Sequence, residues 1–249
     1  MSGNDTVVKV DHATVRFNMA SVKVDNLKEY AIRLIKRQLM FKEFLALQDV
    51  SLEVKKGEAW GIMGRNGSGK STLLKLICGI LSPYKGTVKV NGTIAPLIEL
   101  GAGFDGELNA TENIFLNGAL LGYSKKFMES KFDEIVEFAE LRDFLEVPVK
   151  NYSSGMRARL GFAVATTVRP QLLVVDEVLA VGDYAFQQKC EARMKDMLAK
   201  GTTLLYVSHS ANSVKNLCQK ALWIDKGKEV MHGDVQTVCS AYMASMQKK

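Results

Sequence analysis

A glycine-rich run that ends in a lysine and a hydroxyl is the part of this sequence best suited to binding phosphate. Residues 64–71 (GRNGSGKS) fit the pattern G-x-x-x-x-G-K-[ST] and lie between an apolar strand-like run and an apolar helical run. Glycines let successive backbone N–H groups point at phosphate oxygens, the lysine reaches the β- and γ-phosphates, and the hydroxyl binds Mg²⁺. We call residues 64–71 the phosphate loop. The residues expected to touch a nucleotide are Gly64, Asn66, Gly67, Ser68, Gly69, Lys70, Ser71 and Thr72.

Two acids at the end of an apolar run suit metal binding and water activation. Leu172–Val175 is typical of a strand and is followed at once by Asp176 and Glu177. A carboxylate at a strand end beside a phosphate loop holds the Mg²⁺ shell. We therefore expect Asp176 to join Ser71 as a metal ligand and Glu177 to be the general base that polarises the attacking water.

Two further segments place polar groups at a helix start and at a strand end. Residues 152–156, which we call the signature segment, precede a helical run, so the Ser153 hydroxyl and the Gly155 backbone N–H are suited to binding an anion. The alternative for this segment is an ordinary helix cap. His209 ends the strand-like run 206–208, where a sensor of the γ-phosphate is expected, although a lone histidine is more often structural.

The order of these motifs resembles that of the ABC ATPase family over nearly the whole chain. The resemblance implies ATP and Mg²⁺ as cofactors and a head-to-tail homodimer. Each ATP would lie between the phosphate loop of one subunit and the signature segment of the other, where Ser153, Ser154 and Gly155 contact it. The resemblance also implies that Lys70 and His209 act on the phosphates and that Asp183 lies in a loop that crosses the dimer interface.

Finer details are most similar to the ATPase subunits of polysaccharide exporters of the O-antigen and teichoic-acid type. The signature segment reads YSSGM, the acid pair is followed by VLAVGD, and residues 97–104 read LIELGAGF. Most ABC ATPases have a glutamine near this last run that contacts Mg²⁺, whereas this chain has Glu99. Glu99 is expected either to bind the metal or to be a structural loop acid.

A basic insertion at residues 22–47 lengthens the usual link between the first two strands. Its apolar residues form one stripe if the segment is helical, namely Leu27, Ala31, Leu34 and Ile35. Such a helix either contacts the membrane surface or a membrane partner, or covers the domain's own core. The insertion blurs the alignment of Tyr30, Phe41 and Phe44. Phe17, at the end of the first strand, is by its position the aromatic residue expected to stack on adenine. The alternative is that its ring belongs to the core.

The resemblance implies a motor subunit on the cytoplasmic face of the bacterial cytoplasmic membrane. It would pair with a six-helix permease that moves a lipid-linked glycan. An ABC ATPase for a non-glycan cargo is the alternative. A soluble ABC protein acting on DNA or ribosomes is disfavoured, because those usually carry two cassettes or a long coiled-coil insertion. The net charge is only +6, and no concentrated basic face is evident in the sequence. No nucleic-acid partner is therefore expected.

The motifs lie on strands that alternate with helices along the chain. This alternation is typical of an α/β fold. We expect a single domain over residues 1–249, a P-loop ABC ATPase cassette. It would have a mixed central sheet, an antiparallel β subdomain, a helical subdomain at about 100–165 and a C-terminal strand and helix from about 225. Residues 87–90 and 93–97 flank an Asn-Gly turn, which predicts a β-hairpin. Asn109–Glu112 resembles a capping box, and residues 125–145 predict one long helix.

Overall fold

Two β-sheets organise the chain in the computed structural model, which describes residues 5–20, 41–97, 101, 103–167, 170–176 and 183–247. The antiparallel sheet has the order β2-β1-β4, built from β1 (Thr6–Ala20), β2 (Phe41–Lys55) and β4 (Lys85–Val90). The larger sheet has the order β5-β6-β7-β3-β8-β9. Its strands are β3 (Ala59–Met63), β5 (Ile94–Leu97), β6 (Leu172–Val175), β7 (Thr203–Val207), β8 (Lys220–Asp225) and β9 (Lys228–Asp234).

The larger sheet is parallel except at one edge, where β9 runs antiparallel to β8. Helix α2 (Lys70–Ile77) joins the two sheets through one apolar cluster. In that cluster Leu73 and Leu74 of α2 are fully buried together with Val8 of the antiparallel sheet and Ile62 of the larger sheet. Burial of these side chains fixes the start of α2 against both sheets.

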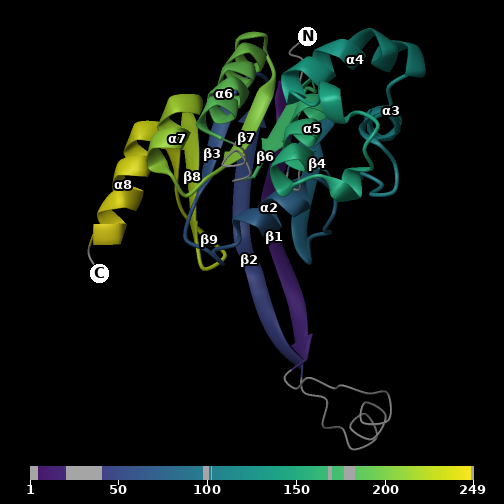
Figure 1. Ribbon diagram of the computed structural model, residues 1–249. Helices are drawn as coiled ribbons and strands as arrows, with labels where there is room; N and C mark the ends of the chain where they lie inside the picture. Colours follow the sequence, from purple (N-terminus) through teal and green to yellow (C-terminus); the bar gives the residue numbers. More distant parts are fainter. Residues whose placement is uncertain are drawn as a thin grey trace, which may run out of the picture.

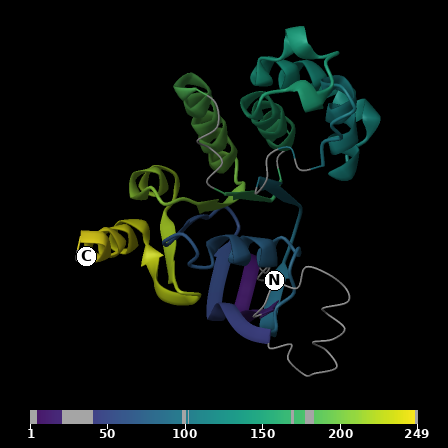
Figure 2. The same ribbon diagram turned by 60° about the horizontal axis from the view of Figure 1, so that its bottom comes forward.

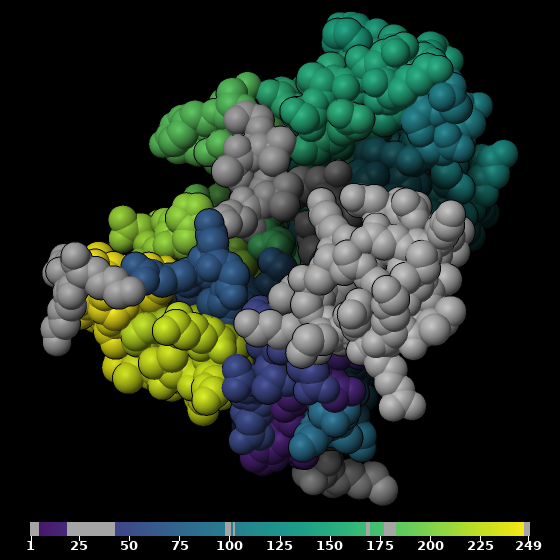
Figure 3. Space-filling view, turned by 90° about the horizontal axis from the view of Figure 1, so that it is seen from below, coloured from purple at the N-terminus to yellow at the C-terminus, as the bar shows by residue number. Residues whose placement is uncertain are grey.

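The helices of residues 110–167 gather at one end of the molecule (Figure 1). They are α3 (Ala110–Leu120), α4 (Lys125–Ala139) and α5 (Ser154–Thr167), with short turns at Arg142–Phe144 and Val149–Asn151. In the space-filling view this helical subdomain, in teal and green, and the antiparallel sheet, in purple and blue, lie at opposite sides of the face shown (Figure 3). The remaining helices are α6 (Tyr184–Ala199), α7 (Ala211–Leu217) and α8 (Val235–Gln247).

The expected architecture is confirmed: a mixed sheet, an antiparallel sheet and a helical subdomain. The capping box is confirmed as well, because Asn109 Oδ1 accepts from the Glu112 amide and Glu112 Oε2 accepts from the Asn109 amide, both at 2.9 Å. The helix expected over 125–145 is shorter. It ends at Ala139, since Glu140 adopts a left-handed conformation with φ 59°.

The β-hairpin expected around Asn91 is wrong. β4 pairs with β1, while β5 pairs parallel with β6 in the other sheet. The Asn91 amide donates to Val7 O at 2.8 Å, and Thr93 O accepts from the Leu172 amide at 3.0 Å. The turn, in which Gly92 has φ 108°, carries the chain from one sheet to the other. No hairpin forms, because β4 and β5 each pair with a strand more distant in the sequence.

The basic insertion is narrower than expected at its C-terminal end. Residues 41–47 belong to β2, and Leu47 is fully buried in the core. β1 and β2 form a ribbon that extends away from the body of the molecule (Figures 1 and 2). Residues 21–40 lie outside the described residues, so the amphipathic helix expected there stays a prediction. No helix among the described residues has both the length and the apolar character needed to cross a membrane.

Candidate nucleotide-binding site

The phosphate loop connects the buried strand β3 to the first turn of α2. Gly69 caps α2 with φ 110°, and a Cβ at this position would lie 2.6 Å from Ala46 O, so only glycine fits. Gly67 has φ 75° but has open space around it. The loop is therefore pressed against β2 on one side and open on the other. The N-terminus of α2 lies at the end of the loop. The first amides of a helix have no partner within the helix, which suits a phosphate.

Lys70 is buried at 7% exposure, and its ammonium group lies against its own loop. Lys70 Nζ donates to Gly64 O at 2.8 Å and to Arg65 O at 3.0 Å. Burial lowers the pKa of Lys70, and the nearby Asp176 carboxylate acts in the opposite direction. A charged lysine held beside the loop and the start of α2 is the arrangement that neutralises a triphosphate.

Ser71 and Asp176, the expected metal ligands, lie within hydrogen-bonding distance of each other. Ser71 Oγ donates to Asp176 Oδ2 at 3.2 Å. Burial raises the pKa of Asp176, against the effects of the Ser71 hydrogen bond and the charges of Lys70 and Lys75. Hydroxyl and carboxylate oxygens are the ligands that Mg²⁺ prefers. In the same loop Ser68 Oγ is buried, and no hydrogen-bond partner is found for it within the described part of the chain. These groups fit a Mg²⁺-bound triphosphate.

A cavity of about 570 Å³ opens beside the phosphate loop. Its lining joins Asn66–Thr72 and Asp176 to an apolar wall formed by Phe17, Phe44 and Ala46. Phe17 and Phe44 are direct cross-strand partners in the ribbon, so their side chains lie on the same face. In the sequence Phe44 falls within the basic insertion, and it is not among the residues expected to contact the nucleotide. Alternation along β2 puts Phe44 and Ala46 on one face. The pairing of Phe44 with Phe17 turns that face toward the loop.

The signature segment lies apart from this cavity. Ser153 Oγ accepts from the Met156 amide at 3.2 Å, so Ser153 caps α5 within its own chain, and Tyr152 donates to Phe144 O at 2.6 Å. A Cβ at Gly155 would meet no described atom closer than Ser153 Oγ at 3.8 Å, so the protomer itself does not require glycine there. None of Ser153, Ser154 and Gly155 lines the cavity at the phosphate loop.

The other expected site residues either do not line the phosphate cavity or lie outside the described residues. His209 follows β7, whose parallel pairing with β3 brings it to the same edge of the sheet as the phosphate loop. Its side chain lines separate hollows beside α7 instead of the phosphate cavity. Asp183 caps α6 and forms an ion pair with Arg159 of α5 at 2.8 Å. Glu99 and Glu177 lie outside the described residues, so their roles as metal ligand and general base stay predictions.

Sequence comparison finds close relatives among transporter subunits. The profile of the ABC transporter family matches residues 47–180. ABC transporter protein AbcA of Aeromonas salmonicida is 48% identical over 81% of this chain and 65% of its own length. O-antigen export system ATP-binding protein RfbB of Klebsiella pneumoniae is 44% identical over 82% of this chain and 83% of its own. Teichoic acids export ATP-binding protein TagH of Bacillus cereus is 42% identical over 97% of this chain. The chain spans only 43% of that protein's length.

Structural comparison gives the same architecture. The solved structure of an ATP-binding subunit of an ABC transporter has a TM-score of 0.76 at 21% identity, and covers 95% of this chain and 93% of its own. A dimeric ATP-binding cassette, MJ0796, bound to ADP and phosphate, has a TM-score of 0.74 at 21% identity over 92% of this chain and 98% of its own. At this identity the likeness is one of fold.

Proposed function

The chain belongs to the ABC transporter family, and we propose that it is the ATP-hydrolysing subunit of an exporter for a lipid-linked cell-surface polysaccharide. The observation that carries the ATPase part is the cavity that joins the phosphate loop to Asp176. The cargo class is supported by relatives that serve O-antigen and teichoic acid export.

The proposed reaction is in-line attack of water on the γ-phosphate of ATP. Lys70, the loop amides and the N-terminus of α2 counter the phosphate charge, so positioning and electrostatics supply most of the catalysis. Ser71, Asp176 and Glu99 would hold Mg²⁺, which when bound would supply further neutralisation of the phosphate oxygens. Glu177 accepts the proton of the attacking water, and His209 contacts the γ-phosphate. Phe17 holds the adenine ring.

The proposed site is completed by a second copy of the chain. The phosphate loop and the signature segment do not share a cavity in one protomer, and Gly155 leaves its surroundings open. In a head-to-tail homodimer, Ser153, Ser154 and Gly155 of one subunit would close over the ATP on the other. ATP would then hold the subunits together, and hydrolysis would release them. Asp183 would lie near this interface.

A membrane subunit of the six-helix type is the proposed partner that carries the glycan. An apolar groove of about 160 Å³ lies between β5, α3 and α5, lined in part by Leu97, Phe104 and Val164. Leu120 at its edge is 67% exposed, which is unusual for a large apolar side chain. We infer that an apolar side chain from a helix of the membrane subunit fills this groove and holds the cassette at the cytoplasmic face of the membrane.

The test replaces the chain in its host by the Lys70→Ala variant. Surface polysaccharide should fall, and its lipid-linked precursor should accumulate inside the cell. The purified variant should no longer hydrolyse ATP, while Lys125→Ala, a change at an exposed lysine of α4, should leave both readouts unchanged. Normal surface polysaccharide together with lost transport of another compound would support a non-glycan cargo and contradict the proposal.

A further inference from the structure

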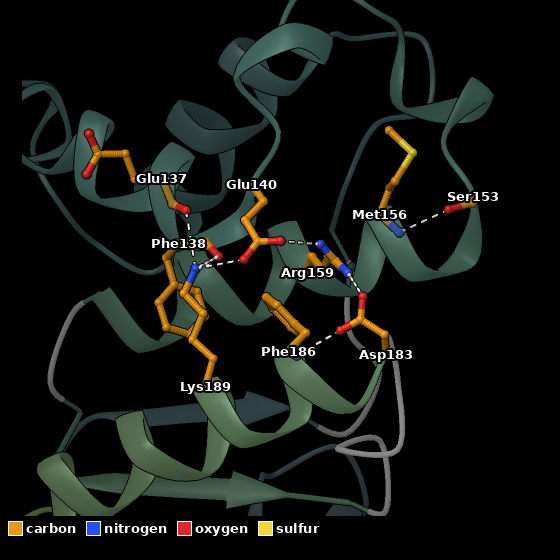
Figure 4. Close-up of polar contacts among 9 residues, drawn as sticks. All are labelled: Glu137, Phe138, Glu140, Ser153, Met156, Arg159, Asp183, Phe186 and Lys189. Carbon is orange, nitrogen blue, oxygen red and sulfur yellow. Dashed lines mark hydrogen bonds and ion pairs between the residues drawn. The ribbon is translucent and has the colours of Figure 1, made fainter.

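Arg159 of α5 lies between two acids that come from different parts of the fold (Figure 4). Its Nη1 donates to Glu140 Oε2 at 2.7 Å, and its Nη2 donates to Asp183 Oδ2 at 2.8 Å. The guanidinium group also lies over the ring of Phe186, with Cζ 4.8 Å from the ring centroid. The side chain is only 19% exposed, so its planar fork is held by three neighbours at once.

Both oxygens of the Asp183 carboxylate are used within the chain. Oδ1 accepts from the Phe186 amide at 2.9 Å and caps α6, while Oδ2 accepts from Arg159. The amide hydrogen bond from Phe186, assisted by Arg159, lowers the pKa of Asp183, so the group is charged at neutral pH. The direction of this side chain is therefore set jointly by the first turn of α6 and by a residue of α5.

Glu140, the second acid paired with Arg159, also contacts α6. Its Oε1 accepts from Lys189 of α6 at 3.1 Å, and Lys189 also donates to Phe138 O at 3.0 Å near the end of α4 (Figure 4). The charges thus alternate from Lys189 to Glu140 to Arg159 to Asp183. Lys189 lies in α6, and Asp183 is the N-cap of the same helix. Rings of Phe138, Phe162 and Phe186 pack against one another, with centroids 5.7 to 6.5 Å apart.

The same arginine is also tied to the signature segment. Gly155 lies in the first turn of α5, and Arg159 follows it by one turn, so both lie on one face of the helix. Ser153 caps that turn through the Met156 amide, as Figure 4 shows. A rotation or shift of the start of α5 would therefore pull Arg159 away from Asp183.

We infer that Arg159 is a positioning residue that holds the signature segment and Asp183 in a fixed relation within one protomer, so that both meet the partner subunit as one rigid surface. The inference rests on the proposed homodimer. It assigns Arg159 no contact with ATP. It explains why a guanidinium is present here, since a lysine ammonium would bind one acid and lose the link to the other.

The test compares Arg159→Gln and Arg159→Lys with Arg193→Gln. Arg193 is a matched control: it is 23% exposed, pairs with Glu134 at 2.7 Å and lies over Phe138, also joining α6 to the helical subdomain, but it does not touch Asp183. The measurements are thermal unfolding, ATP affinity of the monomer, kcat and KM of hydrolysis, and ATP-driven dimerisation in a Glu177→Gln background.

All three variants should unfold at lower temperature than the parent. The Arg159 variants alone should lose about 10- to 100-fold in kcat and dimerise only at higher protein concentration, because the surface that meets the partner is misplaced. Monomer affinity for ATP should change little, since the phosphate loop lies elsewhere. Arg159→Gln combined with Asp183→Asn should be no worse than the poorer single variant, because both changes break the same link.

Parental kcat in Arg159→Gln, or an equal loss in Arg193→Gln, would overturn the inference and leave the proposed function intact. A parent protein that binds ATP but neither dimerises nor hydrolyses it would remove the proposed function, and this inference with it. The two failures are distinguished by the behaviour of the parent.

Discussion

The hydroxyl of Ser71 donates a hydrogen bond to Oδ2 of Asp176 at 3.2 Å, although the two residues are 105 positions apart in the sequence. Ser71 lies in the first turn of α2, and Asp176 directly follows the strand β6. The contact joins the two oxygens expected to bind Mg²⁺. We therefore expect a change at Ser71 to alter the Mg²⁺ concentration that hydrolysis requires.

Ser71→Ala should raise the Mg²⁺ concentration needed for half-maximal hydrolysis by at least about tenfold, because one metal oxygen is lost. Ser71→Thr keeps the hydroxyl and is the control. Titration of activity with Mg²⁺ at saturating ATP gives the measurement. An unchanged Mg²⁺ requirement in Ser71→Ala would contradict the assignment of this side chain to the metal.

Glu177→Gln should bind ATP normally and lose roughly 10²- to 10⁴-fold in kcat, the usual contribution of a general base. Because ATP then persists between the subunits, the variant should accumulate as a dimer when ATP is added. Single-turnover hydrolysis and size-exclusion chromatography measure the two effects. If the variant turns over ATP at the parental rate, another residue is the base.

Phe17→Ala and Phe44→Ala should each weaken ATP binding about tenfold, because stacking on a base is worth roughly 1–3 kcal/mol. Both rings line the cavity beside the phosphate loop. Leu45→Ala is the control, since Leu45 alternates to the opposite face of β2 and is 38% exposed. Isothermal titration should show that inorganic triphosphate, which has no base, binds all the variants alike.

A loss of triphosphate binding in either phenylalanine variant would mean that the ring supports the loop instead of the base. An effect of Phe17→Ala without any effect of Phe44→Ala would leave Phe17 as the adenine contact and remove Phe44 from the site.

Glu58→Gln should lower the free energy of unfolding by about 1 kcal/mol at pH 7, with a lower melting temperature. Burial alone would raise the pKa of Glu58, but hydrogen bonds from Lys220, Trp60 and the Lys55 amide outweigh it and hold the pKa below its ordinary value of 4.5. The stabilisation is therefore present above pH 4.5 and is lost as the pH falls through the lowered pKa.

The difference between Glu58→Gln and the parent should accordingly shrink in acid. Glu129→Gln removes one acid of an exposed ion pair with Lys125 and should change stability little at any pH. A Glu58→Gln deficit that stays constant from neutral to acidic pH would contradict the charged role of Glu58.

Much of the fold follows from local patterns. Asn109 and Glu112 form the expected capping box because both partners lie within one turn, so no distant contact decides the matter. The Asn91-Gly92 turn is different. Its chemistry suits a hairpin, yet β4 pairs with β1 and β5 with β6, because register in a sheet depends on distant strands.

The same limit applies to Phe44 and Arg159. Phe44 lies on the loop-facing side of the ribbon only because β2 pairs with β1 in a register that sets it opposite Phe17. Arg159 gains its two acids from the end of α4 and the start of α6, which the packing of three helices brings together. Neither placement can be derived from spacing along the chain.

The sequence by itself determined the phosphate loop and the family, because these depend on residues a few positions apart or on the order of short motifs. The tertiary structure decided which distant groups meet: Ser71 with Asp176, Phe17 with Phe44, and Arg159 with Asp183. It also separated the phosphate loop from the signature segment within one protomer. The physical reason is that strand pairing and helix packing minimise the free energy of the whole chain, and local preference constrains only its parts.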